Sequence, residues 1–407
     1  MPPPPAPARA RAPFVLAFAL AHFGIYAALM MPPLIGLALR VAQIDAARKS
    51  SRLALVLSLG AAVAMATRPI AGALSDRAGR RKPWLVGGLL AGCAGLALVA
   101  DGGYERLVGG WCLAQFGFNV SLAALAALLH DCVPDAQRGR VMGAAGLCMA
   151  LGTLAGAALA RGAGSAAAFG CGAALATVTT FALLLSFAER GTAAAPRRPP
   201  DPASAVRRFL IDPRGAPGFA WVFLSRFLAT TGHALMLSYQ VYYLADGLRV
   251  APAGVPEAVF GATLVSVGSS ACASVAGGWL SDRWRRRKAF LFAAALIDAC
   301  GLFWIGRATD YAGFLAGVAL IGLGGGLYLA VGLALVTALL PRGGADAAKD
   351  LGLFNLSSTL PQAVAPALAP LLLGLGGGAA NFAALMTGAA ALAALGAVAV
   401  LPLRRVR

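Results

Sequence analysis

Three side chains of this sequence can change protonation state inside long apolar segments: His22, His233 and Asp298. An ionisable group in a bilayer core costs about 2.5–3.5 kcal/mol on insertion scales, so such residues are rare and need a reason. Histidine titrates near neutral pH without large tuning. His22 and His233 are therefore the first candidates for binding and releasing a proton, and Asp298 is the third.

Uncharged polar and aromatic residues accompany these groups in the apolar segments. Amides and aromatic rings with polar tips offer hydrogen bonds and stacking faces, which suit an amphiphilic or hydroxyl-rich small molecule. The alternative is that they only hydrogen-bond neighbouring helices. The predicted binding set is His22, Tyr26, Gln115, Asn119, His233, Gln240, Tyr243, Tyr328 and Gln362. Two arginines in the same segments, Arg68 and Arg226, are expected to extend toward the nearer membrane surface.

Motifs of enzymes and of ATP-driven pumps are absent. The sequence contains no HExxH, no GxSxG, no paired carboxylates and no GxxxxGK[ST] loop, so neither an enzyme nor a nucleotide-driven pump is predicted. The seven cysteines form no CxxC pair, which argues against a disulfide framework or a metal site. No cofactor is predicted.

Composition identifies the class of protein. Hydrophobic residues make up 59% of the 407 residues and charged residues only 12%, half of the roughly 25% that is usual for soluble proteins. The net charge of +18 comes from basic residues in loops between apolar segments. That position orients helices and contacts lipid headgroups, whereas a nucleic-acid binder gathers its cations on one soluble face. The expected partners are a small-molecule substrate and membrane lipids, with no nucleic acid, and the chain is expected to be a monomer.

Apolar runs of about 20 residues predict membrane-spanning helices. We expect an all-α membrane protein with twelve transmembrane helices in two pseudo-symmetric six-helix bundles. The predicted organisation is a disordered cytoplasmic tail (1–12), an N-terminal bundle (13–188), a cytoplasmic linker (189–217) and a C-terminal bundle (218–403). The predicted spans are 13–37, 53–74, 84–100, 107–129, 141–160, 166–187, 218–244, 259–280, 289–306, 311–340, 353–373 and 381–401.

The distribution of basic residues predicts the orientation. Most of the 34 Lys and Arg residues lie in the tails, the linker and alternate loops, and positively charged loops stay in the cytoplasm. We therefore expect a multi-pass protein of the cell membrane with both termini cytoplasmic. The first outer loop, with Arg40, Arg48, Lys49 and Arg52, is the exception.

An internal repeat supports the two bundles. The segment Gly72-Ala-Leu-Ser-Asp-Arg-Ala-Gly-Arg-Arg-Lys82 recurs as Gly278-Trp-Leu-Ser-Asp-Arg-Trp-Arg-Arg-Arg-Lys288, half a chain length later. At the same spacing, Thr153-Leu154 matches Thr359-Leu360. A fixed spacing of this size predicts two homologous halves.

The motif Gly-x-Leu-x-Asp-Arg-x-Gly-Arg-Arg-Lys resembles the signature loop of the major facilitator superfamily. The resemblance implies that the helices over 13–37, 107–129, 218–244 and 311–340 line a central cavity, and that the halves work by alternating access. It also implies an outer position for the helix over 289–306, so Asp298 is expected to be structural. The motifs Val133-Pro134 and Arg138-Gly139-Arg140 are similar to a high-GC bacterial group near the glycoside and sucrose branch.

The same resemblance implies a gate in the repeated loops. Asp76 and Asp282 would latch the halves, with Arg138 or Arg140 as the partner of Asp76. Gly79 suits a tight turn. The alternative is that these loops are only charge clusters that stop membrane insertion. The predicted gating set is Asp76, Arg77, Gly79, Arg80, Arg138, Arg140, Asp282 and Arg283.

The resulting functional hypothesis is a secondary transporter that exports a small organic molecule in exchange for protons. Import of a sugar-like solute with protons and uncoupled facilitation are the alternatives. A membrane-embedded enzyme is the hypothesis from another class, and the missing nucleophile and metal motifs oppose it.

Overall fold

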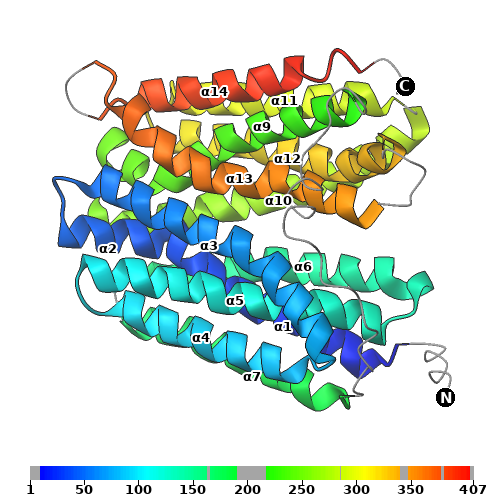
Figure 1. Cartoon of the computed structure of the whole chain (residues 1–407). Coiled ribbons are helices and arrows are strands. Elements are labelled where there is room, and N and C mark those ends of the chain that lie inside the picture. The colour runs from blue at the N-terminus through cyan, green and yellow to red at the C-terminus, as the bar shows by residue number, and fades with distance from the viewer. Residues whose placement is uncertain are drawn as a thin grey trace. The chain divides into compact units, whose positions relative to one another are not determined.

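The computed structural model describes residues 10–162, 166–189, 217–284, 286–339, 347–376 and 380–403, with the side chains at 282, 333–339 and 347–353 left out. The regular structure of these ranges is entirely helical (Figure 1). Contacts divide the chain into two compact units, Met1–Pro196 and Arg197–Arg407, called unit 1 and unit 2 below. Most of the predicted tail and linker lies outside the described residues.

Unit 1 begins with a helix that has a π-helical turn near its end, because two prolines remove backbone donors there. It comprises α1 (Ala12–Met31), the π turn η1 (Pro32–Gly36), α2 (Leu37–Ile44), α3 (Lys49–Ala78), α4 (Lys82–Ala100), α5 (Tyr104–Cys132), α6 (Asp135–Leu159), the 3-10 turn η2 (Ala160–Gly162) and α7 (Ala166–Ser186).

Unit 2 repeats this order of helices. It comprises α9 (Pro217–Tyr242), the π turn η3 (Tyr243–Gly247), the 3-10 turn η4 (Pro252–Gly254), α10 (Val255–Trp284), α11 (Arg287–Ile305), α12 (Tyr311–Leu339), α13 (Ala347–Leu373) and α14 (Phe382–Val398).

Ten helices of the described chain are long and apolar enough to cross a membrane. Two more complete the predicted set: α14 is apolar but has only 17 residues, and α9 is long but carries several polar side chains. The predicted fold class, an all-α protein of twelve membrane helices, is confirmed, and the chain is a multi-pass membrane protein.

The two units use the same packing scheme. In unit 1, α1 packs against α6 and α7, α5 packs against α3 and α4, and α4 also contacts α7. In unit 2, α9 packs against α13 and α14, α12 packs against α10 and α11, and α11 also contacts α14. Each helix of one unit thus has a counterpart with equivalent neighbours in the other, as the sequence repeat predicts.

Small residues allow the helices to approach closely at their crossings. In unit 1, a Cβ atom added to Gly117 of α5 would collide with the backbone of Gly92 of α4. At the corresponding crossing of unit 2, a Cβ atom added to Gly324 of α12 would lie 3.0 Å from the backbone nitrogen of Asp298 on α11. Asp298 therefore occupies a tight crossing where the other unit has a glycine.

Candidate functional site

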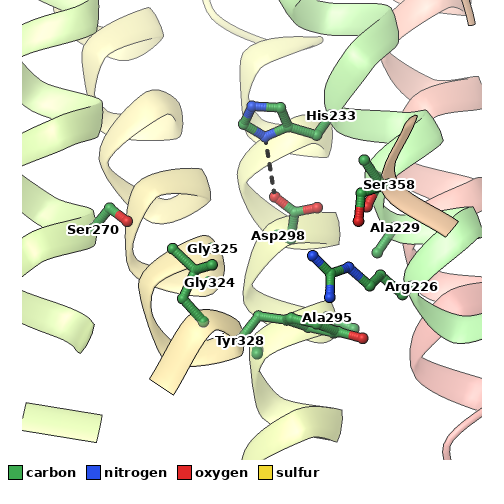
Figure 2. A pocket seen from close by; sticks show the side chains of 13 residues that line it. Arg226, Ala229, His233, Ser270, Ala295, Asp298, Gly324, Gly325, Tyr328 and Ser358 are labelled. Carbon is green, nitrogen blue, oxygen red and sulfur yellow. Dashed lines mark ion pairs between the residues drawn. The ribbon is translucent and has the colours of Figure 1, made fainter. Parts of the chain in front are cut away.

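A pocket of about 230 Å³ lies among five helices of unit 2. Figure 2 shows an ionisable cluster inside it: His233 and Asp298 face each other, and Arg226 extends beneath Asp298, above the ring of Tyr328. The lining residues are Arg226, Ala229, Thr230 and His233 of α9, Ser270 of α10, Ala294, Ala295 and Asp298 of α11, Gly324, Gly325, Tyr328 and Leu329 of α12, and Ser358 of α13.

His233 and Asp298 form the titratable pair of this pocket. The Nδ1 atom of His233 lies 4.0 Å from Oδ1 of Asp298, with 37% of the His233 side chain exposed and 10% of the Asp298 side chain. At that distance, a proton on His233 creates a direct charge attraction to ionised Asp298, and a proton on Asp298 weakens it. The sequence predicted these residues as separate candidates with Asp298 in a structural role. The structure instead brings both into one pocket, because α11 packs against α9 as well as α12.

Arg226 lies against aromatic rings of unit 2, and its expected extension toward a membrane surface stays a prediction. Its guanidinium carbon lies 4.6 Å from the ring centre of Phe354 and 5.5 Å from that of Tyr328. Both rings belong to or pack against a buried hydrophobic cluster that includes Phe219, Val222, Leu291, Phe354, Val400 and Leu403. Cation–π contact with the two rings holds the charge within the helices.

Two residues that line the pocket, Tyr328 and Ser358, have fully buried hydroxyl oxygens without a hydrogen-bond partner in the described part of the chain. A buried hydroxyl without a partner costs about 1–3 kcal/mol. Such groups are expected where a ligand or water completes the site.

The remaining predicted binding residues of unit 2 lie outside this pocket. Tyr243 is buried in packing, and its hydroxyl donates to the carbonyl oxygens of Ile305 (2.5 Å) and Ala308 (3.4 Å). Gln240 is also buried, with Nε2 unpartnered among the described residues, while Gln362 is exposed. Tyr243 thus stabilises the fold rather than lining the pocket.

On α1 of unit 1, His22 is buried against a neighbouring ring. Its Nδ1 atom lies 2.9 Å from the carbonyl oxygen of Phe18, and the two ring centres are 4.7 Å apart. Tyr26, one turn further along, is half-buried. Local contacts therefore account for the position of His22.

Gln115 and Asn119 of α5 form a network with Arg68 of α3. Arg68 Nε donates to Asn119 Oδ1 at 2.6 Å, and Asn119 Nδ2 donates to Gln115 Oε1 at 3.0 Å. The structure brings both predicted amides together and joins them to Arg68 within unit 1. The packing of α3 against α5 is the reason.

Asp76 pairs with Arg81 rather than with Arg138 or Arg140. Arg81 Nη2 lies 2.8 Å from Asp76 Oδ1, and Arg81 Nε lies 2.8 Å from Asp131 Oδ2 on α5. Burial disfavours the charged form, but bonding to Asp131 and Asp76 outweighs it and raises the pKa of Arg81. Arg81 was predicted to be only part of a charge cluster. Its role as the shared partner of two carboxylates was missed.

Glu189, just after α7, was also missed by sequence reasoning. Its Oε1 atom accepts from the backbone nitrogens of Arg81 (2.5 Å) and Lys82 (2.9 Å) at the start of α4. A carboxylate at this position satisfies free donors and the positive end of the helix dipole. The acid therefore links the end of α7 to the α3–α4 turn.

The other predicted gating residues have local roles or are exposed. Arg138 pairs with Asp135 three residues earlier and donates to the Val133 carbonyl oxygen at 3.2 Å. Gly79 ends α3 with a φ of 62°, a left-handed conformation that favours glycine. Arg77, Arg80 and Arg140 are exposed, as is Arg283, which lies over the Trp279 ring. The Asp282 side chain is outside the described ones.

No group of three or more His, Cys, Asp or Glu side chains is arranged as a metal site within the described ranges. The described lining of the unit 2 pocket offers one guanidinium, one carboxylate, one imidazole and four side chains with hydroxyl groups.

Two overlapping parts of the chain, residues 14–270 and 222–407, match the family model described as Major Facilitator Superfamily. The chain belongs to the major facilitator superfamily. This membership, together with the twelve-helix fold, indicates a transporter rather than an enzyme. No curated protein sequence matches the chain significantly.

Solved transporters share the superfamily fold with this chain at low sequence identity. A nucleoside transporter is 12% identical with a TM-score of 0.77, covering 96% of this chain and 100% of its own. A peptide transporter in complex with alafosfalin is 15% identical with a TM-score of 0.77, covering 97% and 94%. A D-xylose-proton symporter is 14% identical with a TM-score of 0.74, covering 95% and 96%. These likenesses establish the fold and not the substrate.

Proposed function

We propose that the protein is a proton-coupled secondary transporter of a small organic molecule. The observation that carries the proposal is the unit 2 pocket, which places His233 and Asp298 4.0 Å apart on membrane helices. Ionisable residues inside membrane helices usually mark ion or proton pathways. Hydrophobic packing alone would not require such a pair.

His233 and Asp298 are suited to hold one exchangeable proton. With the proton on His233, the imidazolium and the carboxylate attract each other; with the proton on Asp298, the pair is neutral. Small and largely apolar residues such as Ala294 and Gly324 line the pocket around the pair, so substrate entering the pocket changes the surroundings of both groups. Alternating access, the working principle of this family, would expose the pair to each side of the membrane in turn.

Two directions of transport follow from the same site. Export by proton exchange requires that proton and substrate bind in turn, whereas import by symport requires that they bind together. The Val133-Pro134 and Arg138-Gly139-Arg140 motifs, similar to the sugar-carrying branch, favour import. If neither direction is coupled to protons, the protein is a facilitator.

The test uses purified protein in vesicles and a solute selected because it stabilises the protein against heat. We expect a pH gradient to drive accumulation of that solute by the wild type in one vesicle orientation. His233→Gln and Asp298→Asn should abolish accumulation while exchange at equal pH persists.

His130→Gln is the matched control, because His130 is an exposed histidine at the end of α5 with a local backbone contact to Ala126. It should accumulate solute normally. His22→Gln separates the remaining predicted proton site from the pair. Undiminished accumulation by both His233→Gln and Asp298→Asn would overturn the proposal.

A further inference from the structure

Among the residues that the structure describes, none accepts a hydrogen bond from the guanidinium group of Arg226. An arginine presents five N–H donors in a planar fork. In the part of the chain that the structure describes, the contacts of Arg226 are the rings of Phe354 and Tyr328, with no hydrogen bond and no ion pair. Stacking on two rings leaves the edge of the fork available, and Figure 2 shows that edge directed into the pocket.

Side chains that carry hydroxyl groups surround the same space. Thr230, Ser270, Tyr328 and Ser358 line the pocket together with Arg226. A planar carboxylate matches the guanidinium fork with two parallel hydrogen bonds, and hydroxyl groups complete its remaining lone pairs. A neutral or cationic ligand would offer the guanidinium group no anionic partner, and Asp298 would then be the acid of the pocket that balances its charge.

The pocket contains four titratable or charged groups: Arg226 and His233 from α9, Asp298 from α11 and Tyr328 from α12. The residues that α10 and α13 contribute, Ser270 and Ser358, are not ionisable, and α14 has no ionisable residue. With Asp298 ionised and His233 neutral, the net charge is zero. One added proton on either group makes it +1, which balances one carboxylate.

We propose that the unit 2 pocket binds the carboxylate of a small organic monoanion at Arg226, together with one proton on the His233–Asp298 pair. This inference rests on the proposed proton site. Proton and anion then move in the same direction as a neutral set. A buried pocket with no net charge avoids the cost of an unpaired charge. A dianion such as a phosphate monoester would need a second cation, which the described lining does not contain.

Ligand binding by purified protein in detergent tests this inference without any proton gradient. The probes are acetate, lactate and benzoate, each compared with its own neutral amide, and inorganic phosphate. The readout is the rise in melting temperature with probe concentration, which reports the dissociation constant.

We expect at least one carboxylate to stabilise the wild type more than its amide and more than phosphate. The dissociation constant should fall as pH is lowered, by up to about tenfold per pH unit, the limit for one linked proton. Arg226→Gln should weaken carboxylate binding at least about tenfold, the usual effect of losing a charge-assisted bond. Arg226→Lys keeps the charge without the fork and should lie between the two.

Asp298→Asn is expected to strengthen carboxylate binding, a result that a folding defect would not produce. It removes the competing carboxylate, so carboxylate binding should be tight at high pH and vary little with pH. Arg307→Gln is the matched control, because Arg307 also lies over a ring, that of Phe303 at 4.8 Å, but is exposed and outside the pocket. It should bind like the wild type.

The inference is overturned if no carboxylate exceeds its amide, if Arg226→Gln binds as tightly as the wild type, or if binding is equally tight at all pH values. These results are independent of vesicle transport. Carboxylate binding in an uncoupled carrier would overturn only the proposed function, whereas proton-driven accumulation of a neutral solute without carboxylate binding would overturn only the anion site.

Discussion

Buried charges in this protein find their partners on helices that are distant in sequence. Arg81 reaches Asp131 on α5, Arg68 reaches Asn119 on α5, and His233 reaches Asp298 on α11. An isolated charge in a membrane protein is costly, so each pair also stabilises the crossing of its two helices. Arg226 differs from these residues because its described contacts are aromatic rings.

Arg81 is expected to be the most important single residue for the stability of the α3–α4 turn. Arg81→Gln removes two ion pairs and leaves Asp131 without its partner, so we expect a loss of about 1–3 kcal/mol, measured by thermal or denaturant unfolding in detergent. Arg80→Gln, at an exposed neighbouring position, should change stability by less than about 0.5 kcal/mol. Equal stabilities of the two variants would contradict the role of Arg81.

Asp76→Asn separates stability from function at the same site. The Asp76 side chain is 57% exposed, so losing its pair with Arg81 should cost at most about 1 kcal/mol. If Asp76 also acts as the gating latch that its repeated motif suggests, transport in vesicles should fall severely while the melting temperature barely changes. Near-normal transport would leave Asp76 with a minor structural role.

Sequence reasoning found the ionisable residues but not their arrangement. His233 and Asp298 were both identified because a bilayer makes such residues conspicuous. Their proximity depends on which faces of α9 and α11 meet, and the sequence does not predict that contact, because the lipid-facing and protein-facing sides of a membrane helix are both largely apolar. For the same reason, the contacts that Arg226 and Arg68 make with other helices could not be predicted.

At the scale of helices, the Gly324–Asp298 crossing controls where the pocket carboxylate lies. Gly324→Ala would place a methyl group 2.7 Å from the Ala294 carbonyl oxygen and 3.0 Å from the Asp298 nitrogen. We expect a loss of about 1–3 kcal/mol in stability from overpacking, measured by unfolding.

Gly325→Ala is the control for that substitution, because a Cβ atom at this adjacent residue would meet nothing within 4 Å. Alanine also has a higher helix propensity than glycine. The stability of Gly325→Ala should therefore equal or exceed that of the wild type. A similar loss in both variants would mean that the crossing is not tight.

The lengths of the helices were less predictable than their number. The predicted span 53–74 lies within α3, which extends from Lys49 to Ala78. The predicted span 13–37 ends at the first residue of α2, which continues to Ile44. Polar residues such as Arg40 end an apolar run without ending a helix. Backbone hydrogen bonding continues until a true stop occurs, such as Gly79 in its left-handed conformation.

For the whole molecule, the expected orientation leads to a matched labelling experiment. In a cysteine-free background, we expect Ala253→Cys to react with an impermeant thiol reagent added to intact cells, because the loop before α10 is expected to be external. Ala136→Cys, at the start of α6, should react only after the membrane is permeabilised. Both residues are exposed in the structure, so accessibility alone would not produce a difference. The reverse pattern would invert the topology.

The equivalent crossings of the two units differ in what occupies them. The crossing of Gly92 with Gly117 brings two backbones into close contact, whereas its counterpart pairs Gly324 with Asp298. The carboxylate of unit 2 therefore lies at a crossing with little free volume, and the glycine of the neighbouring helix provides the room for it. A single methyl group at position 324 would compete with the acid for space, while the same change at Gly325 would not.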